Sequence, residues 1–296
     1  MKVFYSRRLT PYLYLLPMLV LLLIVFGYPL VSIFNYSLRR IRVNTGPFIG
    51  LENYKTVLRD SVFREAATHN VLLLLSVPIL LALSLFVAVV LYERVSGWYI
   101  YRSVLFVPYI IAVPIAGVVF SNLFQRSGAI NQILNAVGLN FLALDWLGSE
   151  KLALWTVMLV IVWHEVGFGI VLFLARLLSL DESLQEAAMV DGAGWWQRLW
   201  YVTIPQLRTI IEFYVTITVI AILAWVFAYV YVMTRGGPGT ATQILELYIY
   251  NYAFRNGLPG IASAVAVMLF LVTLLLIIPL FRFRSQTETG GETNER

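Results

Sequence analysis

Two ionisable residues stand side by side in an apolar stretch of the sequence, where acid–base chemistry is one conceivable role. His164 and Glu165 follow Trp163 near the centre of the run 152–174. If this stretch spans a membrane, a charge near its centre costs about 2.5 to 3.5 kcal/mol on insertion scales. We therefore expect these side chains to face a protein interior or a water-filled cavity. No nucleophile or metal-ligand set accompanies them, which argues against catalysis. Lining a solute path and forming a structural hydrogen bond between helices both remain open.

The geometry of a helix adds one expectation about these neighbours. Adjacent positions on an α-helix point about 100° apart. We therefore expect His164 and Glu165 to face different directions, so that one could line a solute path while the other pairs with a neighbouring helix or a partner subunit.

The composition of the chain indicates that lipid is its main solvent. Of its 296 residues 60% are hydrophobic and 12% charged, and the mean hydropathy is +0.82. A soluble domain has about 25% charged residues, so a soluble enzyme, a disordered protein and a nucleic-acid-binding module are poor interpretations. Without cysteine, and with only two histidines, the sequence predicts neither a disulfide nor a metal site. The net charge of +5 suits anionic headgroups.

Six apolar runs reach the length of roughly 20 residues that a membrane-spanning helix needs. We therefore predict an all-α, polytopic membrane protein whose membrane domain occupies residues 1–285. The predicted spans are about 12–36, 71–92, 103–124, 152–174, 210–233 and 261–281. Residues 286–296 are polar and carry no motif, so we predict a disordered tail there.

The first apolar run follows three basic residues, as the core of a secretory signal would. It is longer than the 7 to 15 residues typical of a signal core and contains no small-residue cleavage site, so we interpret it as an uncleaved signal-anchor. Six spans place both termini on one side of the membrane. Outside the loop 39–70 the basic residues favour the side of the N-terminus, which predicts that both termini are cytoplasmic. The arginine cluster within that loop argues the other way.

The loop between the fourth and fifth runs, residues 179–208, has the pattern of a folded element. Ser179 with Glu182, and Ser183 with Glu186, have the spacing of a capping box at a helix start. Small and apolar residues then repeat at helical spacing, so we predict a short amphipathic helix from Ser183 to Asp191. The helix is expected to end at two glycines, with interface aromatics and a proline bend following; these residues are Gly192, Gly194, Trp195, Trp196, Trp200, Tyr201 and Pro205.

This loop resembles the cytoplasmic signature of the permease subunits of binding-protein-dependent ABC importers. That EAA signature reads E-A-A, three residues, G, nine residues, I, one residue, L-P. The matching residues are Glu186, Ala187, Ala188, Gly192 and Pro205. Val202 and Ile204 stand where Ile and Leu are usual, and both departures conserve volume.

The resemblance covers nearly the whole chain. Outside the loop, the chain is similar to the carbohydrate-importing branch of the family, of the maltose and glycerol-phosphate type. Residues 48–54 resemble that branch's F-x-G-L-x-N-Y segment, and residues 234–242 resemble its T-x-G-G-P-x-x-x-T segment. Val71 departs from the pattern of that branch, in which Thr is common at this position. The resemblance implies the type I importer permease (MetI-like) fold with six transmembrane helices, in the inner membrane of a bacterial or archaeal cell.

The resemblance also implies the function and the partners. The chain would be one half of the membrane pathway of an ATP-driven carbohydrate or polyol importer that works by alternating access. A second permease, which is usually a distinct homologue, two cytoplasmic ATPases, an extracytoplasmic solute-binding protein and the lipid bilayer would be its partners. The predicted short helix would dock on the ATPase, with Glu186 fixing its orientation and the two alanines permitting close approach. Asp191, Gly192 and Pro205 belong to the same ATPase-coupling set. The plainer alternative for Glu186 is a carboxylate that stabilises the helix dipole.

ATP chemistry is not expected on this chain. The sequence contains no G-x-x-x-x-G-K-[ST] phosphate loop. We therefore expect ATP and Mg²⁺ on the partner ATPase, no cofactor or metal on this chain, and no enzymatic activity of its own.

Two further groups of residues are candidates for contact with the solute. Sugar recognition needs flat apolar rings together with hydrogen-bonding groups. Trp225 and Tyr229 are four residues apart in the run 210–233, so we expect them to share one helix face, either toward the solute path or in packing or lipid contact. Gly236, Gly237 and Pro238 predict a tight turn that shapes the outer mouth.

The alternatives to this interpretation are a permease for another solute, a secondary transporter and a membrane enzyme. An ABC permease for a non-sugar solute remains open, because substrate choice in the family rests largely on the external binding protein. A secondary transporter would show internal repeats with broken helices, and a membrane enzyme would need paired carboxylates or metal ligands; the sequence shows neither. The solute could be a monosaccharide, a disaccharide, a longer oligosaccharide or a polyol phosphate.

Overall fold

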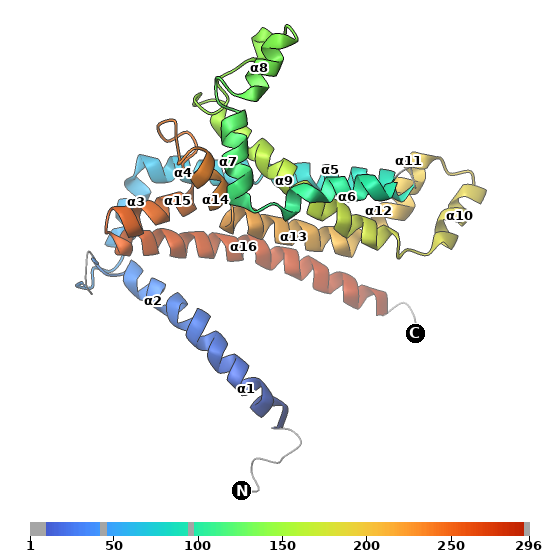
Figure 1. The fold of residues 1–296 in the computed structure, drawn as a ribbon. Helices are drawn as coiled ribbons and strands as arrows, with labels where there is room; N and C mark the ends of the chain where they lie inside the picture. Colours follow the sequence, from blue (N-terminus) through green and yellow to red (C-terminus); the bar gives the residue numbers. More distant parts are fainter. Residues whose placement is uncertain (1–9, 42–45, 94–97, 293–296) are drawn as a thin grey trace. The chain divides into compact units, whose positions relative to one another are not determined.

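The computed structural model describes residues 10–41, 46–93 and 98–292. The regular elements within these ranges are helices, and strand pairing there is limited to an isolated bridge between Arg39 and Phe48. The first half of the chain forms α1 (Thr10–Leu22), α2 (Tyr28–Ser37), α3 (Glu52–Arg59), α4 (Ser61–Leu73), α5 (Ser76–Tyr92), α6 (Trp98–Ile110), α7 (Val113–Leu123) and α8 (Ala129–Ala136) (Figure 1).

The second half of the chain continues the all-helical pattern. It forms α9 (Ala153–Leu177), α10 (Glu182–Val190), α11 (Trp195–Arg198), α12 (Ile204–Gln206), α13 (Arg208–Ala224), α14 (Phe227–Met233), α15 (Leu245–Tyr250) and α16 (Pro259–Glu292). Short π-helical segments occupy Leu23–Gly27, Leu199–Thr203 and Asn251–Arg255, and a 3-10 turn occupies Asn140–Leu142. The prediction of an all-α protein is confirmed.

Four helical stretches among the described residues are long and apolar enough to cross a membrane. They are Tyr12–Ser37, Ser61–Tyr92, Ala153–Leu177 and Pro259–Pro279. Two further pairs of helices meet the same criteria together but are sharply bent, by 95° between Ile100–Ile110 and Val113–Leu123 and by 70° between Trp195–Gln206 and Arg208–Ala224. The predicted number of six spans is reached if each bent pair is one crossing.

The chain divides into two compact units, and the first combines Met1–Asp60 with Tyr248–Leu271. Within it, the buried amide of Asn53 on α3 donates to the carbonyl oxygens of Ser37 (2.8 Å) and Arg39 (2.9 Å). A Cβ atom on Gly260 would lie 2.5 Å from the Arg39 carbonyl oxygen, so glycine is what lets α16 begin against this segment.

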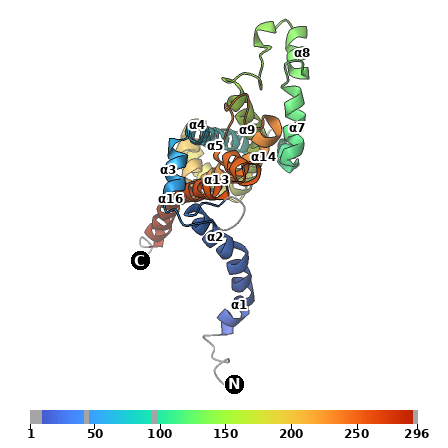
Figure 2. The same cartoon turned by 90° about the vertical axis from the view of Figure 1, so that its left-hand side faces the viewer.

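The second unit combines Ser61–Leu247 with Val272–Arg296. Here α5 and α6 pack along α9, α13 contacts both α5 and α9, and α14 packs against α7 (Figures 1 and 2). Gly169 on α9 permits the closest approach, because a Cβ there would lie 2.4 Å from the Ser84 Oγ of α5 and 2.6 Å from the Tyr214 Oη of α13. Those two hydroxyls are 3.2 Å apart in a buried hydrogen bond, a typical way to join helices in apolar surroundings.

Two of the predicted spans differ from single helices. The third, 103–124, breaks after Ile110, where Ala112 has an extended backbone (φ −59°, ψ 131°) and the following helix begins with Pro114 in its first turn. The fifth, 210–233, is interrupted at Trp225, whose φ of −120° ends α13. Apolar composition predicts burial in lipid but does not mark where such a helix breaks.

At the end of the chain α16 extends to Glu292. The disordered tail over 286–296 stays a prediction. The remaining residues, 293–296, lie outside the described part of the chain.

Candidate functional site

The short helix expected in the loop 179–208 is α10, and its start differs from the predicted capping boxes. The N-cap is Asp181, whose side chain accepts a hydrogen bond from the backbone N–H of Ser183 at 2.9 Å. That backbone hydrogen bond lowers the pKa of Asp181, because it favours the carboxylate. Asp181 therefore replaces the serines as the cap, since its Oδ1 satisfies a free amide that they were expected to satisfy.

The end of α10 agrees with the expectation at one glycine and not at the other. Gly192 has a φ of +79°, and the N–H of Ala193 donates to the Ala188 carbonyl at 2.9 Å, so the helix closes in a left-handed turn. Gly194 instead starts α11 as its N-cap, where its N–H donates to the Gln197 Oε1 at 2.8 Å.

The predicted coupling residues lie on the surface of this unit. Glu186, Ala187, Asp191, Gly192 and Pro205 are exposed, and Ala188 is half-buried. Several large apolar side chains of α10 are exposed as well; they are Leu184, Met189 and Val190, the last with 87% of its surface accessible. The helix thus leaves most of its surface uncovered by the described part of the chain.

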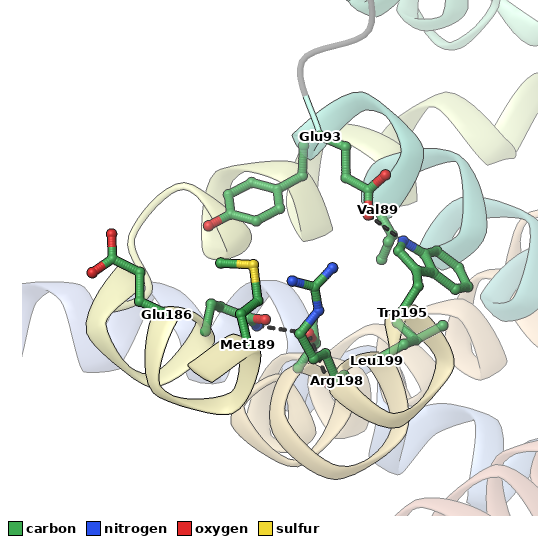
Figure 3. A pocket seen from close by; sticks show the side chains of 10 residues that line it. Val89, Glu93, Glu186, Met189, Trp195, Arg198 and Leu199 are labelled. Carbon is green, nitrogen blue, oxygen red and sulfur yellow. Dashed lines mark hydrogen bonds between the residues drawn. The ribbon is translucent and has the colours of Figure 1, made fainter. Parts of the chain in front are cut away.

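Two side-chain contacts hold the loop, one within it and one to the bundle. The Gln185 amide of α10 donates to the Thr203 Oγ1 at 2.9 Å. The Trp195 indole N–H donates to a carboxylate oxygen of Glu93, the residue that follows α5 (Figure 3). The bend that follows lies at Leu207, two residues after the proline expected to mark it.

A cavity of about 240 Å³ opens between these elements (Figure 3). Its walls come from the end of α5, from α10 and from the segment after it. The residues labelled in the close-up are Val89, Glu93, Glu186, Met189, Trp195, Arg198 and Leu199. The sequence pattern gave no sign of this cavity, because its walls come from three separate stretches of chain.

The second candidate site is a polar network inside the bundle. The buried His164 imidazole contacts the Ile111 carbonyl oxygen through Nε2 (2.8 Å) and the Glu165 Oε1 through Nδ1 (3.2 Å). A carbonyl oxygen can only accept, so Nε2 carries a proton. The Tyr229 hydroxyl also donates to the Glu165 Oε1, at 3.0 Å. His164 and Glu165 were expected to face different directions, but they bind each other, because the flexible glutamate side chain reaches across the angle between their backbone positions.

The two tryptophans differ in their relation to this network. Trp163 adjoins it, with the centroid of its ring 6.3 Å from that of the His164 ring. Trp163 packs its ring edge-on against Phe120, with centroids 4.6 Å apart. Trp225 is 75% exposed at the break after α13, whereas Tyr229 is buried on α14. The expected shared face of Trp225 and Tyr229 does not exist, since the helix is interrupted between them.

A small cavity of about 80 Å³ adjoins Glu165 and brings in residues that the sequence analysis did not single out. The Tyr109 and Phe168 rings stack with centroids 5.2 Å apart, and Phe168 stacks with Tyr214 at 6.2 Å. Thr218 adds a buried hydroxyl one turn after Tyr214. The available signal was this pair of hydroxyl-bearing residues four positions apart in the same helix.

The predicted tight turn is present at Gly236. Its φ is +91°, and a Cβ there would lie 2.5 Å from the Gln243 Oε1, so glycine is required. The Thr242 N–H donates to the Gly236 carbonyl at 3.1 Å, and the Thr242 hydroxyl donates to the Gly237 carbonyl at 2.8 Å. The bond between Gly237 and Pro238 is cis. The role of this turn at the outer mouth stays a prediction.

A buried carboxyl group lies shortly after this turn. Glu246 accepts a hydrogen bond from the Asn70 amide at 3.1 Å through Oε2, while its Oε1 has no hydrogen-bond partner among the described residues. Burial raises the pKa of Glu246 to about 7. Among the described residues, Glu246 included, no group of three or more His, Asp or Glu side chains could hold a metal ion.

Comparison with known proteins identifies the family. The family model "Binding-protein-dependent transport system inner membrane component" matches residues 45–285. The chain is 34% identical over 298 residues to the probable ABC transporter permease protein YurN of Bacillus subtilis (strain 168), covering 97% of this chain and 99% of that protein. It is 31% identical over 290 residues to the trehalose/maltose transport system permease protein MalF of Thermococcus litoralis, covering 96% and 97%.

A solved structure shares the fold. It is the crystal structure of a bacterial alginate ABC transporter in complex with an alginate pentasaccharide-bound periplasmic protein, with a TM-score of 0.81, 24% identity and 93% of each chain covered. The predicted permease fold and the family resemblance are both confirmed. With a model match that includes α10 and both candidate sites, the chain belongs to the inner membrane components of binding-protein-dependent transport systems.

Proposed function

We propose that this chain forms one half of the membrane pathway of an ATP-driven importer for a carbohydrate or a related polyol. The observation that carries the proposal is α10, which combines the EAA-type residues with a surface that the described chain leaves uncovered. Relatives named for trehalose and maltose and for arabinooligosaccharides support the solute class. The chain is a permease subunit and not an enzyme.

The partners follow from this assignment. Two cytoplasmic ATPases bind ATP and Mg²⁺, a second permease, distinct from this one, supplies the other half of the pathway, and an extracytoplasmic binding protein delivers the solute. The bilayer is the inner membrane of a bacterial or archaeal cell. Because α10 meets a cytoplasmic ATPase in this arrangement, six crossings place both termini in the cytoplasm as well.

The coupling is mechanical. Ala187 and Ala188 allow close contact with the ATPase because they lack bulk, and Glu186 fixes the orientation of the docked helix. The Gln185–Thr203 hydrogen bond holds α10 to the segment that follows it, and the Trp195–Glu93 hydrogen bond carries movement of the loop into the bundle. ATP supplies the free-energy difference between the inward-open and outward-open states.

The solute path runs past Glu165. Its carboxyl group accepts from the Tyr229 hydroxyl, and His164 positions it from the other side. The adjoining cavity of about 80 Å³ is smaller than the roughly 300 Å³ of a ligand pocket, so it supplies one wall and the second permease supplies the opposite one. The exposed Trp225 takes no part in this wall.

The test is ATP-dependent uptake by the whole transporter. The two permeases and the ATPases are reconstituted in liposomes, and uptake of labelled oligosaccharide is measured with and without the binding protein and ATP. Uptake that needs both components is the expected result. Uptake driven by an ion gradient without nucleotide would refute the proposal, and ATP-dependent uptake of a non-sugar solute alone would refute its solute class.

A further inference from the structure

The cavity beside α10 contains a guanidinium group whose charge is not balanced by any ion pair within residues 46–93 and 98–292. Arg198 is the last residue of α11 and is half-buried. Its side chain points into the space between Met189 and Glu93 (Figure 3). Its backbone carbonyl accepts a hydrogen bond from Thr203, but the described residues offer its side chain no carboxylate within ion-pair distance. A guanidinium carries five N–H donors, and leaving them unsatisfied away from water is costly.

The two carboxylates at the edge of the cavity do not serve Arg198. Glu93 already accepts from the Trp195 indole. Glu186 is exposed, and its carboxylate points away from the guanidinium (Figure 3). The site is therefore a cation with two anionic groups at its rim.

The walls next to the guanidinium are apolar. Val89 is buried, and Leu199 and Met189 lie beside it, while Tyr92, Gln185 and Thr203 form other parts of the lining. When a partner covers the opening, such apolar walls lower the local dielectric constant, which strengthens a charge-assisted hydrogen bond formed inside. A planar carboxylate can meet a guanidinium through two parallel hydrogen bonds, so it is the acceptor that fits best.

We propose that the ATPase partner inserts the carboxylate of an Asp or Glu side chain into this cavity, where it pairs with Arg198. The inference rests on the proposed function, because it requires that α10 meets an ATPase. One wall of the cavity is α10 itself, so a protein that covers α10 also reaches the opening. The ATPase is then held on both sides of the helix, by Glu186 on the outer face and by Arg198 behind it.

The charges at the rim favour a protein over a phospholipid as the occupant. An anionic membrane surface would approach Arg198 past the carboxylates of Glu93 and Glu186, which repel it. A protein surface can present one carboxylate to Arg198 and basic or neutral groups to the rim. The volume of about 240 Å³ is ample for a single side chain.

The experiment measures the affinity of the ATPase for the permease pair in lipid nanodiscs. The variants Arg198→Met, Arg198→Lys and Arg198→Glu are compared with the wild type. The control is Arg176→Met, which removes the same charge from an exposed residue that hydrogen-bonds Ser179 and is not part of the cavity. We expect the dissociation constant to rise at least tenfold for Arg198→Met, more for Arg198→Glu and less for Arg198→Lys, with little change for the control.

The partner residue is identified by charge exchange. In the Arg198→Glu background, acidic residues of the ATPase surface are replaced by Arg one at a time, and one replacement should restore binding. Restoration also shows that the variant permease is folded. If no replacement restores binding, or if Arg198→Met binds the ATPase like the wild type, the proposal is overturned.

Three outcomes distinguish a failure of this proposal from a failure of the proposed function and from binding of a lipid. If the Arg198 variants bind normally while Glu186→Lys weakens binding, the Arg198 pairing fails and the coupling function stands; if neither changes binding, both fail. If Arg198→Met instead lowers the amount of phosphatidylglycerol that co-purifies, with ATPase affinity unchanged, the occupant is a lipid and the proposal is overturned.

Discussion

The Trp195 indole donates a hydrogen bond to the Glu93 carboxylate across 102 positions of sequence, and this contact connects the loop that holds α10 with the end of α5. Trp195 also meets the neighbouring Trp196 ring edge-on, with centroids 4.5 Å apart. The two tryptophans differ in surroundings, because Trp196 is 64% exposed. They form a natural pair of test and control.

Replacing Trp195 by Phe should uncouple ATP hydrolysis from uptake. The ring is kept but the donor to Glu93 is lost, and a hydrogen bond to a charged group contributes about 1.5 to 3 kcal/mol. The ratio of solute imported to ATP hydrolysed in proteoliposomes should fall about tenfold or more, while Trp196→Phe should leave it unchanged. Equal effects of the two variants would show that the hydrogen bond does not carry the movement.

Glu186→Lys should leave the protein in the membrane yet abolish uptake. The side chain is exposed on α10, so the substitution disturbs no packing within the chain. Its reversed charge should disturb the orientation of the docked ATPase. Membrane fractionation followed by uptake measurements tests this, with the exposed Glu150→Lys as a control of the same charge change. Normal uptake by the Glu186 variant would remove the case for α10 as the coupling helix.

The buried Glu246 should make the stability of the protein depend on pH. Its pKa is raised from 4.5 in the unfolded chain to about 7 in the folded protein, so the folded state holds the proton more tightly. The resulting stabilisation is complete below about pH 4.5 and is lost as the pH rises through about 7, with a magnitude on the order of 3 kcal/mol.

Thermal unfolding of the detergent-purified protein measures this effect. The midpoint should fall between pH 5.5 and pH 8 in the wild type. Glu246→Gln should flatten the decline, because glutamine stays neutral throughout. A decline of the same steepness in both proteins would show that another group is responsible.

Gly169→Ala should destabilise the second unit. The added Cβ would lie 2.4 Å from the Ser84 Oγ and 2.6 Å from the Tyr214 Oη, so α5 or α13 has to move away from α9. Overpacking of this kind costs about 1 to 3 kcal/mol, and a lower midpoint of thermal unfolding is expected. Gly27→Ala is the matched control, because its Cβ would meet only the Leu23 side chain at 3.5 Å. Equal midpoints for the two variants would contradict the close approach.

Much of the fold could be predicted from the sequence because lipid imposes a simple rule. A chain crossing hydrocarbon must satisfy its backbone within helices, so apolar runs of sufficient length mark the spans. The rule does not indicate where a membrane-spanning helix is interrupted. At the break before α7, for example, the freed Ile111 carbonyl oxygen is satisfied by His164, which is 53 positions away in the sequence.

The bounds of the helix in the coupling loop were predictable to about one residue, whereas the contacts within the polar sites were not predictable. The spacing of Glu186, Ala187 and Gly192 is local and therefore visible in the sequence. The cap at Asp181 was missed because serine and aspartate at neighbouring positions compete for the same amides. The contacts of Glu165 with Tyr229 and of Trp195 with Glu93 join residues 64 and 102 positions apart, and no local pattern encodes such distances.

The break between α6 and α7 constrains how this protein can be recombined with its relatives. The interruption leaves the Ile111 carbonyl oxygen without a helical donor, and the imidazole of His164 takes that place. A chimera with an unbroken helix over 98–123 would leave the His164 Nε2–H without its acceptor, and one that replaces His164 alone would leave the Ile111 carbonyl oxygen without its donor. Segment swaps among such permeases should therefore transplant the kink and the histidine together.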